Sequence, residues 1–119
     1  MTAALSMLRT PRDFSAMDGV RGRGHPLLSV RARRNDLGHP RFGISTGKKV
    51  GNAVVRNRVR RRIREILRAW DGNGRAGWDI LIVARPGSAT ATFADLRTAL
   101  IALLPPLGTR EGDRKSTRL

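Results

Sequence analysis

The sequence predicts an α+β fold: a single domain in which helices cover one layer of β-sheet. Three observations support this prediction. The chain has 119 residues, which is the size of one small domain. Apolar and polar residues alternate over residues 41–46, as in a half-buried strand. From about residue 52 the apolar period becomes helical, and an apolar run follows at residues 78–84.

A short first helix is predicted to begin at Thr10. Pro11 favours the first helical position, and Asp13 is placed to complete a capping box with Thr10. The helix is expected to run for about two turns, to carry Phe14 and to end near Gly19. A basic loop rich in glycine then leads to the first strand.

Two strands follow, with a turn between them. The first is expected over residues 27–32 and the second over residues 41–46, with the turn at residues 33–38. Along the second strand, alternation places two sets of side chains on opposite faces: Phe42, Ile44 and Thr46 on one, and Arg41, Gly43 and Ser45 on the other. One face is therefore expected to pack while the other lies open to a ligand.

The longest predicted helix starts at about residue 52. At about 100° per residue its apolar side chains fall on one stripe, namely Val55, Val59, Ile63, Ile66, Leu67 and Trp70. Gly72, Gly74 and Gly77 are expected to end it. Residues 78–84 form an apolar strand that is expected to lie at the centre of the sheet. A last helix opens at Thr92, with Asp95 as its capping partner.

The composition indicates a polyanionic partner. Lys and Arg number 24 against 9 Asp and Glu, so the net charge is +15 and the pI is about 12.0. Binding a polyanion relieves this self-repulsion, and nucleic acid is the commonest polyanion in a cytosol. An anionic membrane surface is the weaker alternative, because it would favour an amphipathic helix with bulky apolar residues and little other fold.

Several classes of protein and site are excluded or disfavoured. No apolar run approaches the ~18 to 20 residues of a membrane span. The absence of cysteine excludes a disulfide framework and a thiolate metal site. The first residues lack the features of a signal peptide, so a cytoplasmic location is expected. His25 and His39 stand in loops and the acidic residues are scattered, so no catalytic and no metal-binding residue is predicted.

Residues 48–68 hold nine basic residues and one acidic residue, which is +8 of the total charge of +15. Arg56, Arg60 and Arg64 recur every four residues, so their guanidinium groups lie about 6 Å apart along a helix, close to the phosphate spacing of one nucleic-acid strand. A solvated charged face is the alternative, but such faces usually mix signs so that neighbours pair. Charge alone does not explain Asn57, which stands between two arginines.

The stretch KKVGNAVVRNRVRRRIRE at residues 48–65 resembles the arginine-asparagine-arginine signature of the bacterial ribonuclease P protein family. Residues 8–14, 41–45 and 79–86 resemble the family's first helix, a strand and its last strand, so the resemblance covers roughly residues 8–104. It implies an α-β-β-β-α-β-α sandwich with a central sheet and a left-handed crossover between two parallel strands. Residues 1–7 and 105–119 are expected to be flexible segments outside this single domain.

The resemblance also implies two RNA-binding surfaces. The signature helix and its neighbouring loop would bind the catalytic RNA through Lys48, Lys49, Asn52, Arg56, Asn57, Arg58, Arg60, Arg61 and Arg64. A cleft between the first helix and the sheet would bind the 5′ leader of precursor tRNA, with Phe14 and Arg85 as candidates. A core position for Phe14 is an equal alternative. Asp18 stands where relatives often carry a second aromatic residue, which implies a smaller contribution from base stacking.

This resemblance implies a protein subunit of ribonuclease P, an endoribonuclease in which the RNA performs the hydrolysis. Mg²⁺ is expected to be held mainly by the RNA, with no organic cofactor, and a monomer is favoured. Two alternatives stay open. A ribosomal or other rRNA-binding protein would be indifferent to a 5′ leader, and a protein-only nuclease would cleave without an RNA subunit.

Overall fold

The computed structural model describes residues 5–70 and 77–104. Within these ranges the elements are α1 (Pro11–Ser15), β1 (Gly22–Gly24), β2 (Leu28–Arg34), β3 (Arg41–Thr46), the 3₁₀ turn η1 (Lys48–Val50), α2 (Ala53–Ala69), β4 (Trp78–Ala84), the 3₁₀ turn η2 (Pro86–Ala89) and α3 (Phe93–Leu103). The turn predicted at Gly72 and Gly74 and the tail at residues 105–119 lie outside the described residues.

The described strands form one mixed sheet in the order β1-β2-β4-β3. Strand β2 pairs antiparallel with both β1 and β4, and β3 runs parallel to β4. Strand β4 is therefore internal, as its apolar sequence predicted, and α2 connects the two parallel strands. The α-β-β-β-α-β-α order is confirmed. The left-handed sense of the crossover stays a prediction.

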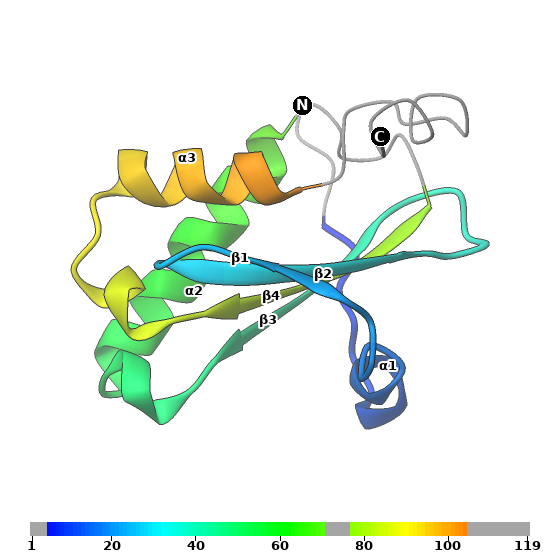
Figure 1. Ribbon diagram of the computed structural model, residues 1–119, viewed down its shortest axis with the longest axis horizontal. Coiled ribbons are helices and arrows are strands. Elements are labelled where there is room, and N and C mark those ends of the chain that lie inside the picture. The colour runs from blue at the N-terminus through cyan, green and yellow to red at the C-terminus, as the bar shows by residue number, and fades with distance from the viewer. Residues whose placement is uncertain (1–4, 71–76, 105–119) are drawn as a thin grey trace.

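Helices cover both faces of the sheet, with α2 and α3 on one face and α1 on the other (Figure 1). The main core lies under α2 and α3 and includes the fully buried side chains of Phe42, Ile63 and Ile80. The rings of Phe42 and Trp70 meet edge to face, with their centroids 6.3 Å apart. This contact fixes the end of α2 against β3.

A smaller apolar cluster lies between α1 and the opposite face of the sheet. Its buried members are Leu8, Met17 and Leu81, and Phe14, Val20 and Val83 pack against them. The predicted capping box is confirmed, because the Thr10 hydroxyl accepts from the Asp13 N–H (3.1 Å) and the Asp13 carboxylate accepts from the Thr10 N–H (3.3 Å). The helix ends at Ser15, which is earlier than expected, and turns continue to Gly19, whose φ of +82° favours glycine.

Three segments differ from the expectations because pairing with distant residues fixes them. Residues 5–7, placed by the sequence in the flexible N-terminus, lie beside β3, where the Phe42 N–H donates to the Ser6 carbonyl (2.8 Å). Strand β2 continues two residues beyond its expected end, because its pairing with β4 extends to Trp78. Residues 22–24 form β1 rather than part of a loop, since they pair with β2.

Candidate nucleic-acid interface

The basic segment begins in a tight turn after β3. Lys48 and Lys49 are exposed in η1. Gly51 follows with φ of +155°, and a Cβ at this position would lie 2.9 Å from the Val55 side chain. Asn52, a predicted RNA-binding residue, caps α2, because its Oδ1 accepts from the Val55 N–H at 3.0 Å. The glycine and the cap together let α2 start directly behind the two lysines.

Burial of one side of α2 sorts its arginines into two flanks. The predicted apolar stripe is confirmed, since its central members are fully buried. At about 100° per residue, Arg58 and Arg62 lie on one side of this stripe, and Arg56, Arg60 and Arg64 lie on the other. The two flanks meet different neighbours.

Arg58 and Arg62 hold the loop that precedes α3. Nη2 of Arg58 donates to the Ala89 carbonyl (3.0 Å), and Nη1 of Arg62 donates to the Ala91 carbonyl (3.1 Å). Arg58, predicted to bind RNA, therefore has a structural partner within the protein. The sequence gives no signal of this contact, because Ala89 lies 31 residues further along the chain.

The opposite flank carries guanidinium groups that are open to a ligand. The guanidinium groups of Arg56 and Arg64 have no hydrogen-bond or ion-pair partner among the described residues. The Nε atoms of Arg56 and of Arg58 are both buried and unpartnered, so this atom does not distinguish the two flanks. Nη1 of Arg60 donates to Oδ1 of Asn57 at 2.9 Å. The asparagine between two arginines therefore orients the middle guanidinium of the row, which charge alone did not explain.

The outer face of α2 adds further positive charge. Arg61 is exposed and has no ion-pair partner within residues 5–70 and 77–104, whereas Glu65 lies 3.8 Å from Arg68. The single acidic side chain of the helix therefore pairs away from Arg56, Arg60 and Arg64. We use the name basic ridge for the cationic residues of η1 and of this side of α2: Lys48, Lys49, Arg56, Arg60, Arg61 and Arg64.

The α1 face of the sheet is the second predicted surface. Alternation along β3 directs Arg41, Gly43 and Ser45 to this face, as predicted. The expectation that it lies open is correct only in part, because Gly43 is buried. A Cβ built on Gly43 would lie 2.8 Å from the Phe14 ring and 3.0 Å from Leu8. The chain that leads into α1 thus returns over this part of the face and covers it.

The two leader-binding candidates lie apart on this face. Phe14 is half-buried above Gly43, so one edge of its ring packs on the sheet. Arg85 is exposed just beyond β4, and its Nη2 lies 3.1 Å from the position that a Cβ on Gly24 would take. Gly43 pairs in register with Leu81, so about 13 Å of strand separates Phe14 from Arg85. The structure does not bring the two side chains into contact.

A buried ion-pair cluster on this face was not predicted. Asp79 of β4 is fully buried and accepts hydrogen bonds from Arg33 (3.3 Å), from Asn35 (2.8 Å) and from two nitrogens of Arg41 (2.9 Å each). Burial alone would raise the pKa of Asp79, but the bonds from Arg41 and Asn35 outweigh it, and the pKa is lowered. The available signal was a lone carboxylate in an apolar strand, and it did not identify partners 38 to 46 residues away.

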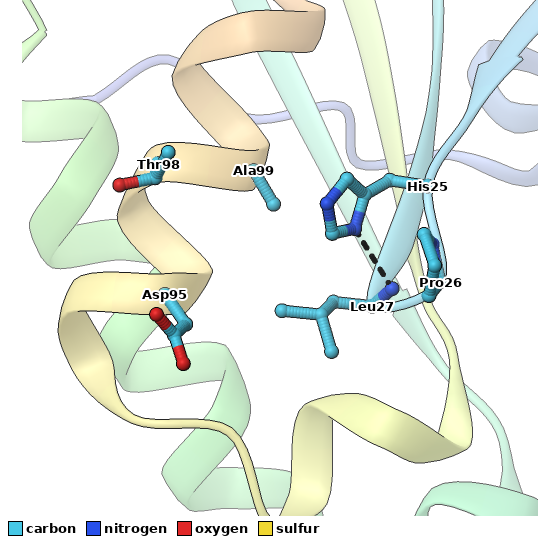
Figure 2. Close-up of a pocket in the computed structure, with 6 residues that line it drawn as sticks. All are labelled: His25, Pro26, Leu27, Asp95, Thr98 and Ala99. Carbon is cyan, nitrogen blue, oxygen red and sulfur yellow. Dashed lines mark hydrogen bonds between the residues drawn. The ribbon is translucent and has the colours of Figure 1, made fainter.

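His25 has a local structural role. Nδ1 of His25 accepts from the Leu27 N–H (3.0 Å) and so closes the turn between β1 and β2. Beside it lies a cavity of about 330 Å³ between this turn and α3, lined by His25, Pro26, Leu27, Asp95, Thr98 and Ala99 (Figure 2).

The described residues contain no group of three or more His, Asp or Glu side chains that could hold a metal ion. In the same ranges, no helix has the length and apolar character needed to cross a membrane.

The sequence is similar to that of proteins of one known family. Residues 3–108 match the family model described as Ribonuclease P. The ribonuclease P protein component of Ruegeria pomeroyi is 38% identical over 114 residues, which cover 88% of this chain and 91% of that protein. The ribonuclease P protein component of Herpetosiphon aurantiacus is 38% identical over 98 residues, which cover 82% and 80%.

Solved structures share the fold. The RNase P protein of Staphylococcus aureus superposes with a TM-score of 0.74 at 26% identity, over 84% of this chain and 93% of that one. The RNase P protein of Thermotoga maritima gives a TM-score of 0.74 at 29% identity, over 90% and 99%. The family match spans all of the described residues and includes the signature helix α2. From its sequence and its fold alike, the chain belongs to the ribonuclease P protein family.

Proposed function

We propose that this chain is the ribonuclease P subunit that binds the catalytic RNA through the basic ridge and the 5′ leader of precursor tRNA on the α1 face. In this role it assists endonucleolytic removal of the leader, while the RNA performs the hydrolysis. The observation that carries the proposal is the sorting of the α2 arginines. One flank is bonded to the protein's own loop. On the other flank, the guanidinium groups of Arg56 and Arg64 have no partner among the described residues, and Arg60 between them is held by Asn57.

The basic ridge suits a phosphate backbone. Guanidinium groups bind phosphate through two parallel hydrogen bonds, which a lysine ammonium does not provide. Those of Arg56, Arg60 and Arg64 recur about every 6 Å along α2. Because Asn57 already orients Arg60, less side-chain freedom is lost when RNA binds.

The α1 face suits a single strand. The half-buried ring of Phe14 offers a surface for stacking, which contributes ~1 to 3 kcal/mol per base. Arg85 supplies an exposed positive charge further along the same sheet. A leader that meets both residues would cross about 13 Å of strand, so an extended conformation is favoured over a folded one.

We further propose that Mg²⁺ is held mainly by the RNA, that the chain needs no organic cofactor, and that it acts as a monomer in the cytoplasm. The acidic residues near the two surfaces support the first point. Asp13 and Asp79 both pair with Arg41, and Glu65 pairs with Arg68. The protein would therefore influence Mg²⁺ indirectly, by binding beside the RNA that holds it.

Reconstitution with a bacterial ribonuclease P RNA at low Mg²⁺ tests the proposed function. The protein should restore processing of precursor tRNA, and the complex should bind precursor more tightly than mature tRNA. A structural rRNA-binding protein would give a complex that is indifferent to the leader. A protein-only nuclease would cleave precursor without the RNA subunit. Either of these two results would overturn the proposal.

A further inference from the structure

Arg41 connects the start of α1 to the sheet. Arg41 of β3 places Nε and Nη2 each 2.9 Å from a different oxygen of Asp79 on the neighbouring strand β4. Its remaining nitrogen, Nη1, lies 3.5 Å from Oδ1 of Asp13 in α1. One planar guanidinium thus joins two strands and a helix, a geometry that a lysine ammonium does not reproduce.

Asp13 is itself fixed to the start of α1. Its Oδ2 accepts hydrogen bonds from the backbone N–H groups of Arg9 (3.2 Å) and Thr10 (3.3 Å). The Thr10 hydroxyl in turn accepts from the Asp13 N–H. A displacement of Asp13 would therefore move the first turn of α1, and Phe14 is the next residue.

The turn that follows α1 is held by a second strand. Arg31 of β2 donates through Nη1 to the Met17 carbonyl (3.4 Å), and the Met17 side chain is fully buried against the sheet. Between these two attachments, the Phe14 ring lies above Gly43. The position of Phe14 is thus constrained from both sides and not by its own contacts alone.

Stability alone does not account for a charged cluster here. Asp79 is fully buried and the Arg41 side chain is 22% exposed. An ion pair buried to this extent contributes little net stability, because the lost hydration offsets much of the attraction. An apolar pair in place of Asp79 and Arg41 would join the two strands but would make no directed bond to α1. The charged cluster does make such directed bonds, and they fix the position of α1 relative to β3 and β4.

We propose that Arg41, bridging Asp79 and Asp13, is a positioning residue for the leader. It sets the height of Phe14 above the sheet and so shapes the surface proposed to bind the leader, without touching the leader itself. This inference rests on the proposed function, because it requires the leader to lie on the α1 face.

Arg41→Lys, with Arg33→Lys as its matched control, tests the inference. Both variants keep the positive charge and both disturb a bond to Asp79, but of the two arginines it is Arg41 that bonds to α1. In the reconstituted holoenzyme, Arg41→Lys should weaken precursor binding by roughly threefold to tenfold, the size of a coupling between contacting residues. Binding of mature tRNA and assembly with the RNA subunit should not change. Arg33→Lys should alter none of the three.

A double-mutant cycle with Phe14→Ala separates positioning from a general loss of stability. If Arg41 acts through Phe14, Arg41→Lys should have no further effect on precursor binding once Phe14→Ala is present. Asp13→Asn keeps an oxygen for the backbone bonds while losing the charge, so it should reproduce the Arg41→Lys effect. Additive effects, or unchanged precursor affinity in a folded Arg41→Lys protein, would overturn the inference. If the wild-type holoenzyme shows no preference for precursor, the proposed function fails instead.

Discussion

At the scale of the residue, Arg56 and Arg58 stand two positions apart on α2 but have different surroundings. This difference assigns RNA binding to Arg56 in the proposed function and a structural contact to Arg58. The guanidinium group of Arg56 has no partner among the described residues, whereas that of Arg58 donates to the Ala89 carbonyl. Both belong to the same signature motif, so residue type and spacing do not distinguish them. The distinction comes from the loop before α3, which approaches one flank of α2.

Arg58→Ala is therefore expected to destabilise the protein by about 1 to 3 kcal/mol, because a partly buried carbonyl loses its charged donor. Urea unfolding monitored by circular dichroism measures the free energy of unfolding. Arg56→Ala is the matched variant, and its free energy of unfolding should stay close to that of the wild type. Equal destabilisation by the two substitutions would remove the distinction between the flanks.

Gly51→Ala is expected to destabilise the protein by roughly 1 to 3 kcal/mol, because φ of +155° is strained for alanine and its Cβ would lie 2.9 Å from Val55. Gly47→Ala is the control. Gly47 has φ of −79° and open space around its missing side chain, so alanine there should be neutral or slightly stabilising. Thermal unfolding of both variants measures the difference, and a Gly51→Ala protein as stable as the wild type would contradict the close start of α2.

At the scale of the element, α1 depends on tertiary contacts. Its five residues are too few for a helix to be stable alone, so its capping box, its apolar side and its ion pair with Arg41 keep it in place. The backbone N–H groups of Arg9 and Thr10, with a further contribution from Arg41, lower the pKa of Asp13 below its ordinary value of 3.8. The pKa of Asp79 is also lowered, since its hydrogen bonds outweigh its burial.

Acid is therefore expected to destabilise the protein through these carboxylates. Because both pKa values are lower in the folded than in the unfolded chain, the stabilisation is fully present above about pH 4. It is lost as the pH falls through the folded values. Carboxyl titration by NMR should give midpoints below 3.8 for Asp13 and Asp79. A midpoint at or above 3.8 for both would show that Arg41 does not stabilise their charged forms.

At the scale of the whole molecule, the sheet separates two surfaces that both meet the central strand β4. The face under α2 and α3 is filled by the main core, so the basic ridge stands on a rigid support. The opposite face carries α1 and the Asp79 cluster. A net charge of +15 is tolerated by such a small domain when a polyanion neutralises it.

The sequence predicted the parts of this arrangement that have local signals. The caps at Thr10 and Thr92 make their expected bonds, and the apolar stripe of α2 is buried as its period required. What it missed depends on residues that are distant in the chain. Residues 5–7 pair with β3, and Arg58 meets Ala89 across the gap between α2 and η2. Neither contact produces a periodic or local pattern in the amino-acid sequence.

The central claim is that the chain holds two RNAs on two separate surfaces. Arg56→Ala and Phe14→Ala, compared in one reconstituted system, test it most directly, with Arg97→Ala on the exposed side of α3 as the control for loss of charge. Arg56→Ala should weaken assembly with the catalytic RNA and reduce its salt slope by about 0.9 or less, while the preference for precursor over mature tRNA persists.

Phe14→Ala should reverse this pattern. The preference for precursor should fall while assembly and its salt slope stay unchanged, because the proposed function places the leader, and not the catalytic RNA, against this ring. If Phe14→Ala instead weakens binding of precursor and mature tRNA equally, its ring belongs to the core. If both variants alter assembly and leader preference together, the two surfaces are not separate and the account is contradicted.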